Sequence, residues 1–125
     1  MPAPSRHKAR TDRNQPDIVK RLKLLGCSVI DLSAVGRGVC DLLVGFKARG
    51  VGPVAVLVEV KDGDKPPSAR RLTPDQRRFF ATFRGPAVVV NDPDEAELVV
   101  TAMRAGDFAV IRRPPFSERL PYPNA

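Results

Sequence analysis

The sequence predicts an α/β fold, in which helices pack around a small mixed sheet. Two observations predict it. Apolar residues recur at helical spacing in three segments, and four short apolar segments rich in β-branched residues lie between them, separated by turns that carry glycine or proline. The expected order is helix, three strands, helix, strand, helix. A chain of 125 residues forms one domain with a substantial core and is too short for two.

The first half of the chain is expected to hold one helix and three strands. The helix covers residues 15–25, because Asn14 is a suitable N-cap, Pro16 lies in the first turn and Gly26 ends the helix. The third strand is almost continuously apolar, which is typical of a central strand covered on both sides. The strands are expected over residues 28–32, 39–46 and 54–60, with a basic, glycine-rich hairpin connection over residues 47–53.

The second half begins with a polar loop, residues 62–71, which is long enough to have a function of its own. Thr73 and Gln76 then form the capping-box pattern of a helix that ends near Gly85. Three further segments complete the prediction: a strand over residues 87–90, a helix over residues 93–105 opened by Asn91 or Asp92, and an apolar stretch over residues 108–111 that is a candidate final strand.

The two ends of the chain differ in composition from the part between them. Residues 1–13 are basic, contain proline and lack apolar periodicity, so they are expected to form a flexible arm that either follows phosphates or only aids solubility. Residues 112–125 are rich in proline and are expected to be an extended tail. The folded domain is therefore placed at residues 14–111.

Charge and cysteine content limit the class of partner. The formal charge is +7, which favours a polyanion, with nucleic acid first and an anionic membrane surface second. No apolar run approaches membrane-spanning length and the amino terminus lacks a signal-peptide core, so a soluble, cytoplasmic protein is expected. Cys27 and Cys40 are widely spaced and His7 is the single histidine, which argues against zinc and for reduced core thiols.

Charged side chains lie on two of the predicted strands. Side chains alternate along a strand, so Glu59 and Lys61 share one face while Val58 and Val60 share the other. Asp41 lies in the strand before it. Two acids and a lysine around one point are what metal-assisted phosphodiester hydrolysis requires. Each residue also has a structural alternative: Asp41 could open its strand, and Glu59 with Lys61 could form an ion pair at the sheet edge.

Three segments in this order resemble the PD-(D/E)XK nuclease superfamily, and within it the VRR-NUC-like and virus-type nucleases related to Holliday-junction resolvases. The resemblance covers residues 11–102. It implies a restriction-endonuclease-like three-layer α/β/α core. Cys40 stands where the family signature has proline, a position that shapes the backbone and does no chemistry. The three segments are residues 36–38 (GRG) before Cys40 and Asp41, residues 57–63 (LVEVKDG) and residues 72–76 (LTPDQ).

The resemblance also implies roles for individual residues. Asp41, Glu59 and the backbone carbonyl of Val60 would hold Mg²⁺, for which Mn²⁺ would substitute. Lys61 would orient or activate the attacking water, and Gln76 would hold the site or the water, although its capping-box role is explanation enough.

The acid that the family carries on its first helix is less clear here. Asp17 is the choice for this metal ligand, with Asn14 as the alternative on the same helix face. If Asn14 occupies the position, metal binding through the helix would be weaker and a second metal doubtful. Arg37, between two glycines, is the best candidate for a phosphate contact near the site. The other candidates for nucleic-acid binding are Lys65, Arg70 and Arg71.

The leading hypothesis is a divalent-metal-dependent DNA endonuclease, structure-selective on branched DNA if it follows the resolvases, in a bacterial or virus-infected bacterial cell. One alternative is a non-catalytic nucleic-acid-binding protein on a nuclease fold, and another is a nuclease subunit activated by a partner protein. A homodimer would present two sites to the two strands of a duplex or a junction. The sequence leaves open whether the nucleic acid is DNA or RNA.

Overall fold

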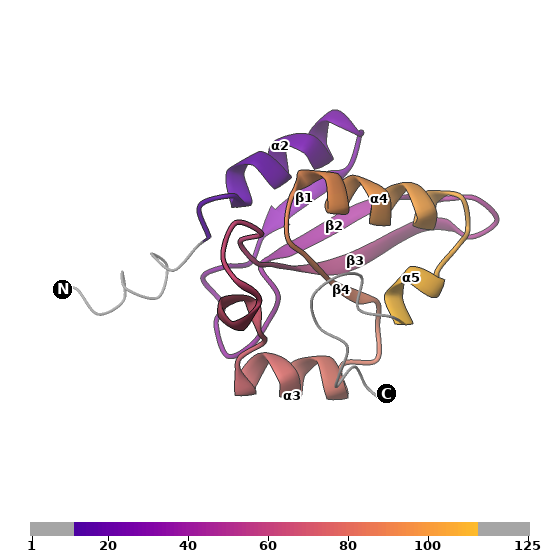
Figure 1. The fold of residues 1–125 in the computed structure, drawn as a ribbon. Helices are drawn as coiled ribbons and strands as arrows, with labels where there is room; N and C mark the ends of the chain where they lie inside the picture. Colours follow the sequence, from indigo (N-terminus) through magenta and orange to yellow (C-terminus); the bar gives the residue numbers. More distant parts are fainter. Residues whose placement is uncertain (1–11, 113–125) are drawn as a thin grey trace.

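A mixed sheet of four strands, in the order β1-β2-β3-β4, organises the chain (Figure 1). The computed structural model describes residues 12–112, so most of the expected basic arm and nearly all of the expected proline-rich tail lie outside the described residues. The strand bounds are β1 (Ser28–Asp31), β2 (Leu42–Ala48), β3 (Gly52–Val60) and β4 (Ala87–Val90).

Strand β3 lies between β2 and β4, as its continuous apolar sequence predicts. It pairs antiparallel with β2 through a hairpin that sets Leu42 opposite Val58, and it pairs parallel with β4, setting Glu59 opposite Val89. Strand β1 completes the sheet antiparallel to β2. The parallel pair requires a crossover, and the chain supplies it with a short 3₁₀ helix, η1 (Pro67–Arg70), and the helix α3 (Pro74–Thr82).

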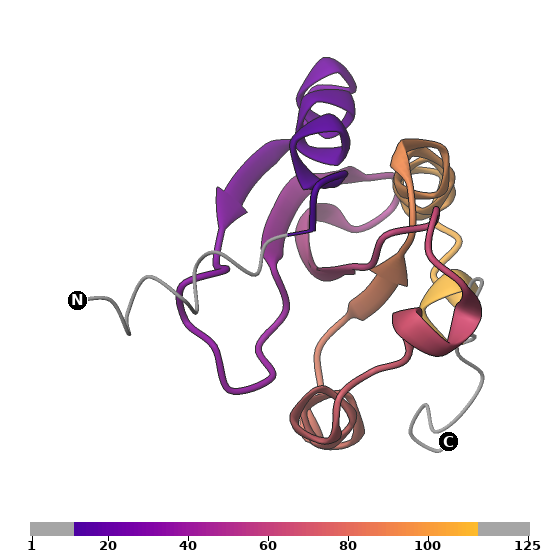
Figure 2. The same cartoon turned by 60° about the vertical axis from the view of Figure 1, so that its left-hand side comes forward.

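Helices cover both faces of the sheet, with α2 (Gln15–Leu24) and α4 (Pro93–Arg104) on one face and α3 on the other (Figures 1 and 2). Ile18 of α2 and Val99 of α4 belong to the same core cluster as Val58 and Val60, whereas Phe80 of α3 belongs to the cluster that contains Leu57. Alternate residues of β3 therefore point to opposite faces. Glu59 and Lys61 follow Leu57 on the α3 side, which confirms the predicted separation from Val58 and Val60.

Local sequence signals account for most of the element boundaries. Thr73 and Gln76 form the predicted capping box at the start of α3, and Asp92 caps α4 by accepting the N–H of Glu95. Strand β4 has the predicted bounds. Strand β2 begins three residues later than expected, at Leu42, because Val39 still belongs to a turn in which its N–H donates to the Gly36 carbonyl at 3.1 Å. Residues 36–38 of this loop have positive φ angles (73°, 60° and 83°).

The apolar stretch 108–111 is a short helix, α5 (Ala109–Arg112), and the prediction of a final strand there is wrong. Two local features explain the helix. The Asp107 carboxylate accepts the N–H of Ala109 at 3.0 Å, which is a helix-capping bond, and Phe108 and Ile111 lie one turn apart and pack against the core beneath α2 and α4. Within residues 12–112, no helix has the length and apolar character needed to cross a membrane.

Candidate functional site

A cleft of about 390 Å³ lies on the α3 side of the sheet, where β3 ends. Its floor is charged, and loops on either side of the strand ends form its walls. The loop before Asp41 contributes Ser33, Gly36, Gly38 and Val39, and the crossover contributes Lys65, Ala69, Arg71 and Thr73. The remaining lining residues are Asp12, Asp41, Glu59, Lys61 and Gln76.

The β2–β3 hairpin brings Asp41 and Glu59 together. Because β2 runs antiparallel to β3, the register that pairs Leu42 with Val58 sets Asp41 opposite Glu59. Asp41 Oδ2 accepts a hydrogen bond from the backbone N–H of Val60 at 2.7 Å. This bond fixes the Asp41 side chain against the end of β3, and Asp41 lines the cleft.

Glu59 is the most deeply buried acid of the cleft, with 2% of its surface exposed. Gln76 Nε2 donates to Glu59 Oε2 at 2.9 Å, and Lys61 Nζ lies 3.8 Å from the same oxygen. Glu59 Oε1 is buried and has no hydrogen-bond partner among the described residues. A buried, ionised oxygen without a hydrogen-bond partner destabilises the folded state. Binding of a proton or a metal cation at Glu59 Oε1 would remove this destabilisation.

Burial is the main cause that raises the pKa values of both carboxyls. Burial raises the pKa of Glu59 well above its ordinary value, and the charge of Asp41 raises it further. Burial also raises the pKa of Asp41, while the Val60 N–H opposes the shift. A proton on Glu59 forms a hydrogen bond to Asp41. Asp41 and Glu59 are therefore more stable with a cation between their carboxyl groups than as two free carboxylates. The cation can be a proton or a metal ion.

Gln76 links the two charged residues of β3 to the start of α3. Its Oε1 accepts hydrogen bonds from Lys61 Nζ at 2.8 Å and from the backbone N–H of Thr73 at 2.9 Å. The same side chain donates to Glu59, so Gln76 completes the predicted capping box and also contacts both charged side chains. The Glu59–Lys61 pair is not an exposed edge pair, since the Lys61 side chain is only 11% exposed.

Asp12 is a further acid of the cleft, although it falls within the segment expected to form the basic arm. Burial raises its pKa, the nearby ammonium of Lys61 lowers it, and its charge raises the pKa values of Asp41 and Glu59. Neither helical spacing nor strand alternation marks this residue. Its only signal is an acid at the junction between a basic segment and a helix.

The two residues considered for the first-helix ligand lie elsewhere. Asp17 is exposed on α2 and does not line the cleft, so the structure does not bring it to Asp41 and Glu59. Asn14 is the residue before α2, but its side chain makes no capping bond. Its amide instead donates to the backbone carbonyls of Lys61, at 3.0 Å, and of Asn91, at 2.8 Å.

Two of the four basic residues predicted to bind nucleic acid line the cleft and two do not. Lys65 and Arg71 line the cleft. Arg70 does not line it, because its guanidinium donates to the backbone carbonyl of Lys65 at 2.9 Å. Arg37 is exposed and does not line the cleft either, although the glycines on both sides of it do. Its φ of 60° makes it the one described non-glycine residue with a positive φ.

The donors present suit a hard cation and no soft one. Among residues 12–112, no group of three or more His, Cys, Asp or Glu side chains is arranged to hold a metal ion. Of the predicted ligands, Asp41 and Glu59 line the cleft, whereas Val60, whose carbonyl was the third, does not. Mg²⁺ commonly binds through one or two carboxylates with water and phosphate completing its shell. The partnerless Glu59 Oε1 fits such an ion. Both Cys27 and Cys40 are free and buried, as expected of core thiols, and His7 lies outside the described residues.

Comparison of the chain with protein-family models, with curated protein sequences and with solved structures finds no match. The function is therefore inferred from the sequence motifs and from the chemistry of this cleft.

Proposed function

We propose that this protein is a divalent-metal-dependent endodeoxyribonuclease of the PD-(D/E)XK superfamily, with a restriction-endonuclease-like core. The observation that carries the proposal is the convergence of Asp41, Glu59 and Lys61 in one cleft, with Glu59 Oε1 buried and lacking a partner. The resemblance of residues 36–41, 57–63 and 72–76 to this superfamily supports the same function.

The two carboxylates would hold the metal ion. Asp41 and Glu59 line a cleft that is open to solvent and phosphate, and the Val60 carbonyl would complete the oxygen-only set that the sequence resemblance implies. When bound, Mg²⁺ would supply Lewis acidity and lower the pKa of a coordinated water. Because Asp41 is already held by the Val60 N–H and Glu59 by the Gln76 amide, one oxygen of each side chain is positioned in advance.

Lys61 would act on the attacking water and on the phosphate. Its ammonium is held at 2.8 Å by Gln76 Oε1, which keeps it in an ion pair with Glu59 Oε2 at 3.8 Å. A positive charge fixed there stabilises the negative charge that develops on the phosphoryl oxygens in the transition state. The Gln76 contact also restricts the long lysine side chain to one direction, so little entropy is lost when the substrate binds.

The walls of the cleft would bind the phosphates that flank the scissile bond. Lys65 and Arg71 lie on the crossover side. On the opposite side the wall is built by Gly36 and Gly38, where the absence of side chains permits a close approach of the DNA backbone. These contacts are independent of sequence, which suits an enzyme that recognises structure rather than a base sequence.

A non-catalytic nucleic-acid-binding protein on the same fold is the alternative. It would account for Lys65 and Arg71, but it gives no reason for a buried Glu59 beside a second acid whose charge raises the Glu59 pKa further. Branched DNA as the preferred substrate and a homodimer as the assembly are proposals that follow from the sequence resemblance.

Cleavage of a labelled panel tests the function. The panel consists of linear duplex, single strand, flap, four-way junction and supercoiled plasmid, each with Mg²⁺, Mn²⁺ or EDTA. We expect metal-dependent cutting that Glu59→Gln and Lys61→Ala abolish and that Asp17→Asn, an exposed acid outside the cleft, leaves intact. Salt-sensitive binding without cutting on any substrate would instead support the non-catalytic alternative.

A further inference from the structure

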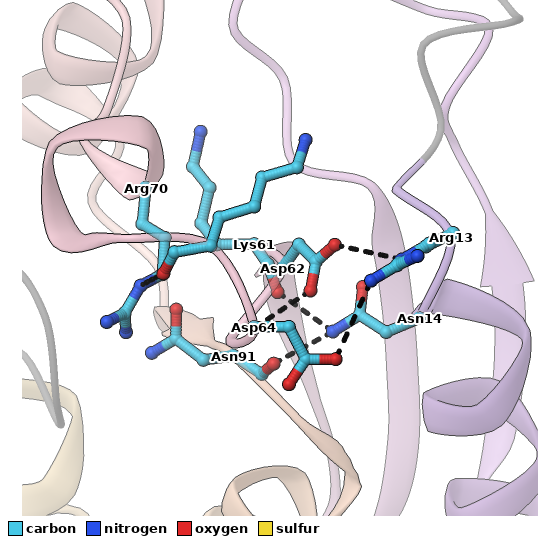
Figure 3. A network of polar contacts seen from close by, with 8 residues as sticks. Arg13, Asn14, Lys61, Asp62, Asp64, Arg70 and Asn91 are labelled. Carbon is cyan, nitrogen blue, oxygen red and sulfur yellow. Dashed lines mark hydrogen bonds and ion pairs between the residues drawn. The ribbon is translucent and has the colours of Figure 1, made fainter.

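Asn14 occupies the position of an N-cap but does not cap its helix. Asparagine is among the most favoured N-cap residues, and its side chain usually accepts an N–H of the first turn. Here the side chain makes no such bond, and its amide crosses to two carbonyls that are 47 and 77 residues away in sequence. Figure 3 shows the Asn14 amide between Lys61 and Asn91.

The two carbonyls lie directly after the ends of the parallel strands β3 and β4. The Lys61 N–H donates to the Val90 carbonyl at 2.9 Å, and the Gly63 N–H donates to the Asn91 carbonyl at 2.9 Å. The Asn14 amide donates to the Lys61 carbonyl at 3.0 Å. The Lys61 peptide is thus held through its N–H by β4 and through its C=O by the segment that precedes α2.

The same segment carries Asp12 into the cleft. Residues 12–14 form a turn, in which the Asp12 carbonyl accepts the Gln15 N–H at 3.0 Å. Arg13 adds ion pairs to Asp62 at 3.3 Å and to Asp64 at 3.7 Å, but its side chain is 76% exposed, and an exposed arginine contributes little. The buried amide of Asn14 is therefore the main attachment of this turn to the ends of β3 and β4.

We propose that Asn14 is a positioning residue of the nuclease site, one that fixes the main chain of Lys61 and holds the turn presenting Asp12 to the cleft. The proposal rests on the proposed function. In this role for Asn14, residues 12–14 belong to the active centre. Asn14 itself neither lines the cleft nor binds the metal. A residue serving only as a helix cap would be replaceable by any other good cap.

Asn14→Ser separates these two roles in the full-length protein. Serine is an equally good N-cap but is too short to reach both carbonyls, and Asn14→Asp matches asparagine in volume and cap preference but lacks the N–H donors. We expect either variant to lower kcat by about 10-fold to 100-fold, as loss of an outer-shell partner typically does. The KM for the best substrate of the panel should stay within about twofold, because no wall residue of the cleft is changed. Asp17→Asn is the matched control and should leave both constants unchanged.

Amide hydrogen exchange provides a readout that does not depend on activity. In Asn14→Ser the amides of Lys61 and Gly63 should exchange faster than in the wild type, while the amide of Val44, in the β2–β3 hairpin, keeps its rate. Unchanged exchange at Lys61 and Gly63, or a wild-type kcat in both variants, would overturn the proposal. If the wild type cuts nothing in the panel, the proposed function fails, and the exchange rates still decide whether Asn14 holds Lys61.

Discussion

Gln76 donates a hydrogen bond to Glu59 Oε2 at 2.9 Å from the first turn of α3, while its own carbonyl oxygen accepts the Lys61 ammonium. One amide thus satisfies one acid and one base of β3, and it can do so only because its donor and acceptor ends differ. The capping box holds Gln76 in place, so the start of α3 and the charged face of β3 are parts of one structural unit.

Gln76→Glu should therefore impair the site while preserving the helix. Glutamate still accepts the Thr73 N–H and the Lys61 ammonium, but it places a second carboxyl against Glu59 Oε2. We expect lower activity at neutral pH and a pH–rate profile whose acidic limb moves to higher pH, because like charges raise each other's pKa.

The control for this variant is Asp92→Ala, which removes the N-cap of α4 outside the lining of the cleft. It should cost about 1 kcal/mol of unfolding free energy and leave the pH–rate profile in place. Equal pH–rate profiles for Gln76→Glu and the wild type would show that Gln76 acts on the helix alone.

The raised pKa of Glu59 makes the stability of the metal-free protein depend on pH. Below the ordinary pKa of glutamate the side chain is protonated in both the folded and the unfolded state. As the pH rises from there through the raised folded-state pKa, the unfolded state loses its proton first, so the folded state is progressively destabilised. In EDTA we expect the melting temperature to fall between weakly acidic and alkaline pH, and to fall less in Glu59→Gln.

Addition of Mg²⁺ should reverse this loss. An ion that binds only the folded state raises the melting temperature by mass action, and at neutral pH it replaces the proton that Asp41 and Glu59 would share. The rise should be absent in Glu59→Gln and small at acidic pH, where protons compete. A melting temperature that ignores Mg²⁺ at every pH would argue against a metal site.

Local sequence patterns predict that Asp41, Glu59 and Lys61 lie together, because their positions follow from residues close to them in the chain. Alternation along one strand sets Glu59 and Lys61 on the same face, and a hairpin sets the preceding strand antiparallel, which brings Asp41 opposite Glu59. Strand β4 and the capping box of α3 also depend on short-range signals. These are the parts of the fold and of the site that the sequence alone predicts.

Other features depend on contacts between residues far apart in the chain, which local sequence patterns do not predict. Asp12 enters the cleft because the turn of residues 12–14 is tied to Lys61, a partner 47 residues beyond Asn14. The stretch 108–111 has strand-like composition, but the Asp107 cap and the core beneath α4 turn it into α5. No periodicity in the sequence encodes either contact.

Asp12→Asn tests whether the Asp12 carboxylate contributes to metal binding at the cleft. Removal of its charge should raise the Mg²⁺ concentration needed for half-maximal activity, because one negative charge near the metal position is lost. Asp17→Asn removes the same charge from the exposed face of α2 and should not move that midpoint. A titration of activity against Mg²⁺ at constant ionic strength measures both, and equal midpoints would exclude a role for Asp12.

Gly38 should be irreplaceable for a steric reason. Its φ is 83°, and a Cβ there would collide with the Asp75 carbonyl at the start of α3. Gly36 has a similar φ of 73° but has no atom within 4 Å of such a Cβ, so it is a matched control for the backbone cost alone. Gly36→Ala should cost about 1–2 kcal/mol of unfolding free energy. Gly38→Ala should lower the unfolding free energy by more than this and should also lower activity, because Gln76 must move with the helix. Equal losses of unfolding free energy in both variants would show that only the backbone conformation matters.

Lys65 and Arg71 should contribute to DNA affinity in a way that salt reveals. Each lines the cleft with an exposed charge, and each phosphate contact releases about one counterion, so removal of one contact lowers the slope of log K against log salt by about 1. Lys65→Gln and Arg71→Gln, measured in the catalytically silent Glu59→Gln background, should each weaken binding and reduce the slope by that amount. Lys20→Gln, on the exposed face of α2, removes the same charge outside the cleft and should leave the slope unchanged. If all three variants reduced the slope equally, DNA would be attracted by the net charge of the chain and not by the walls of this cleft.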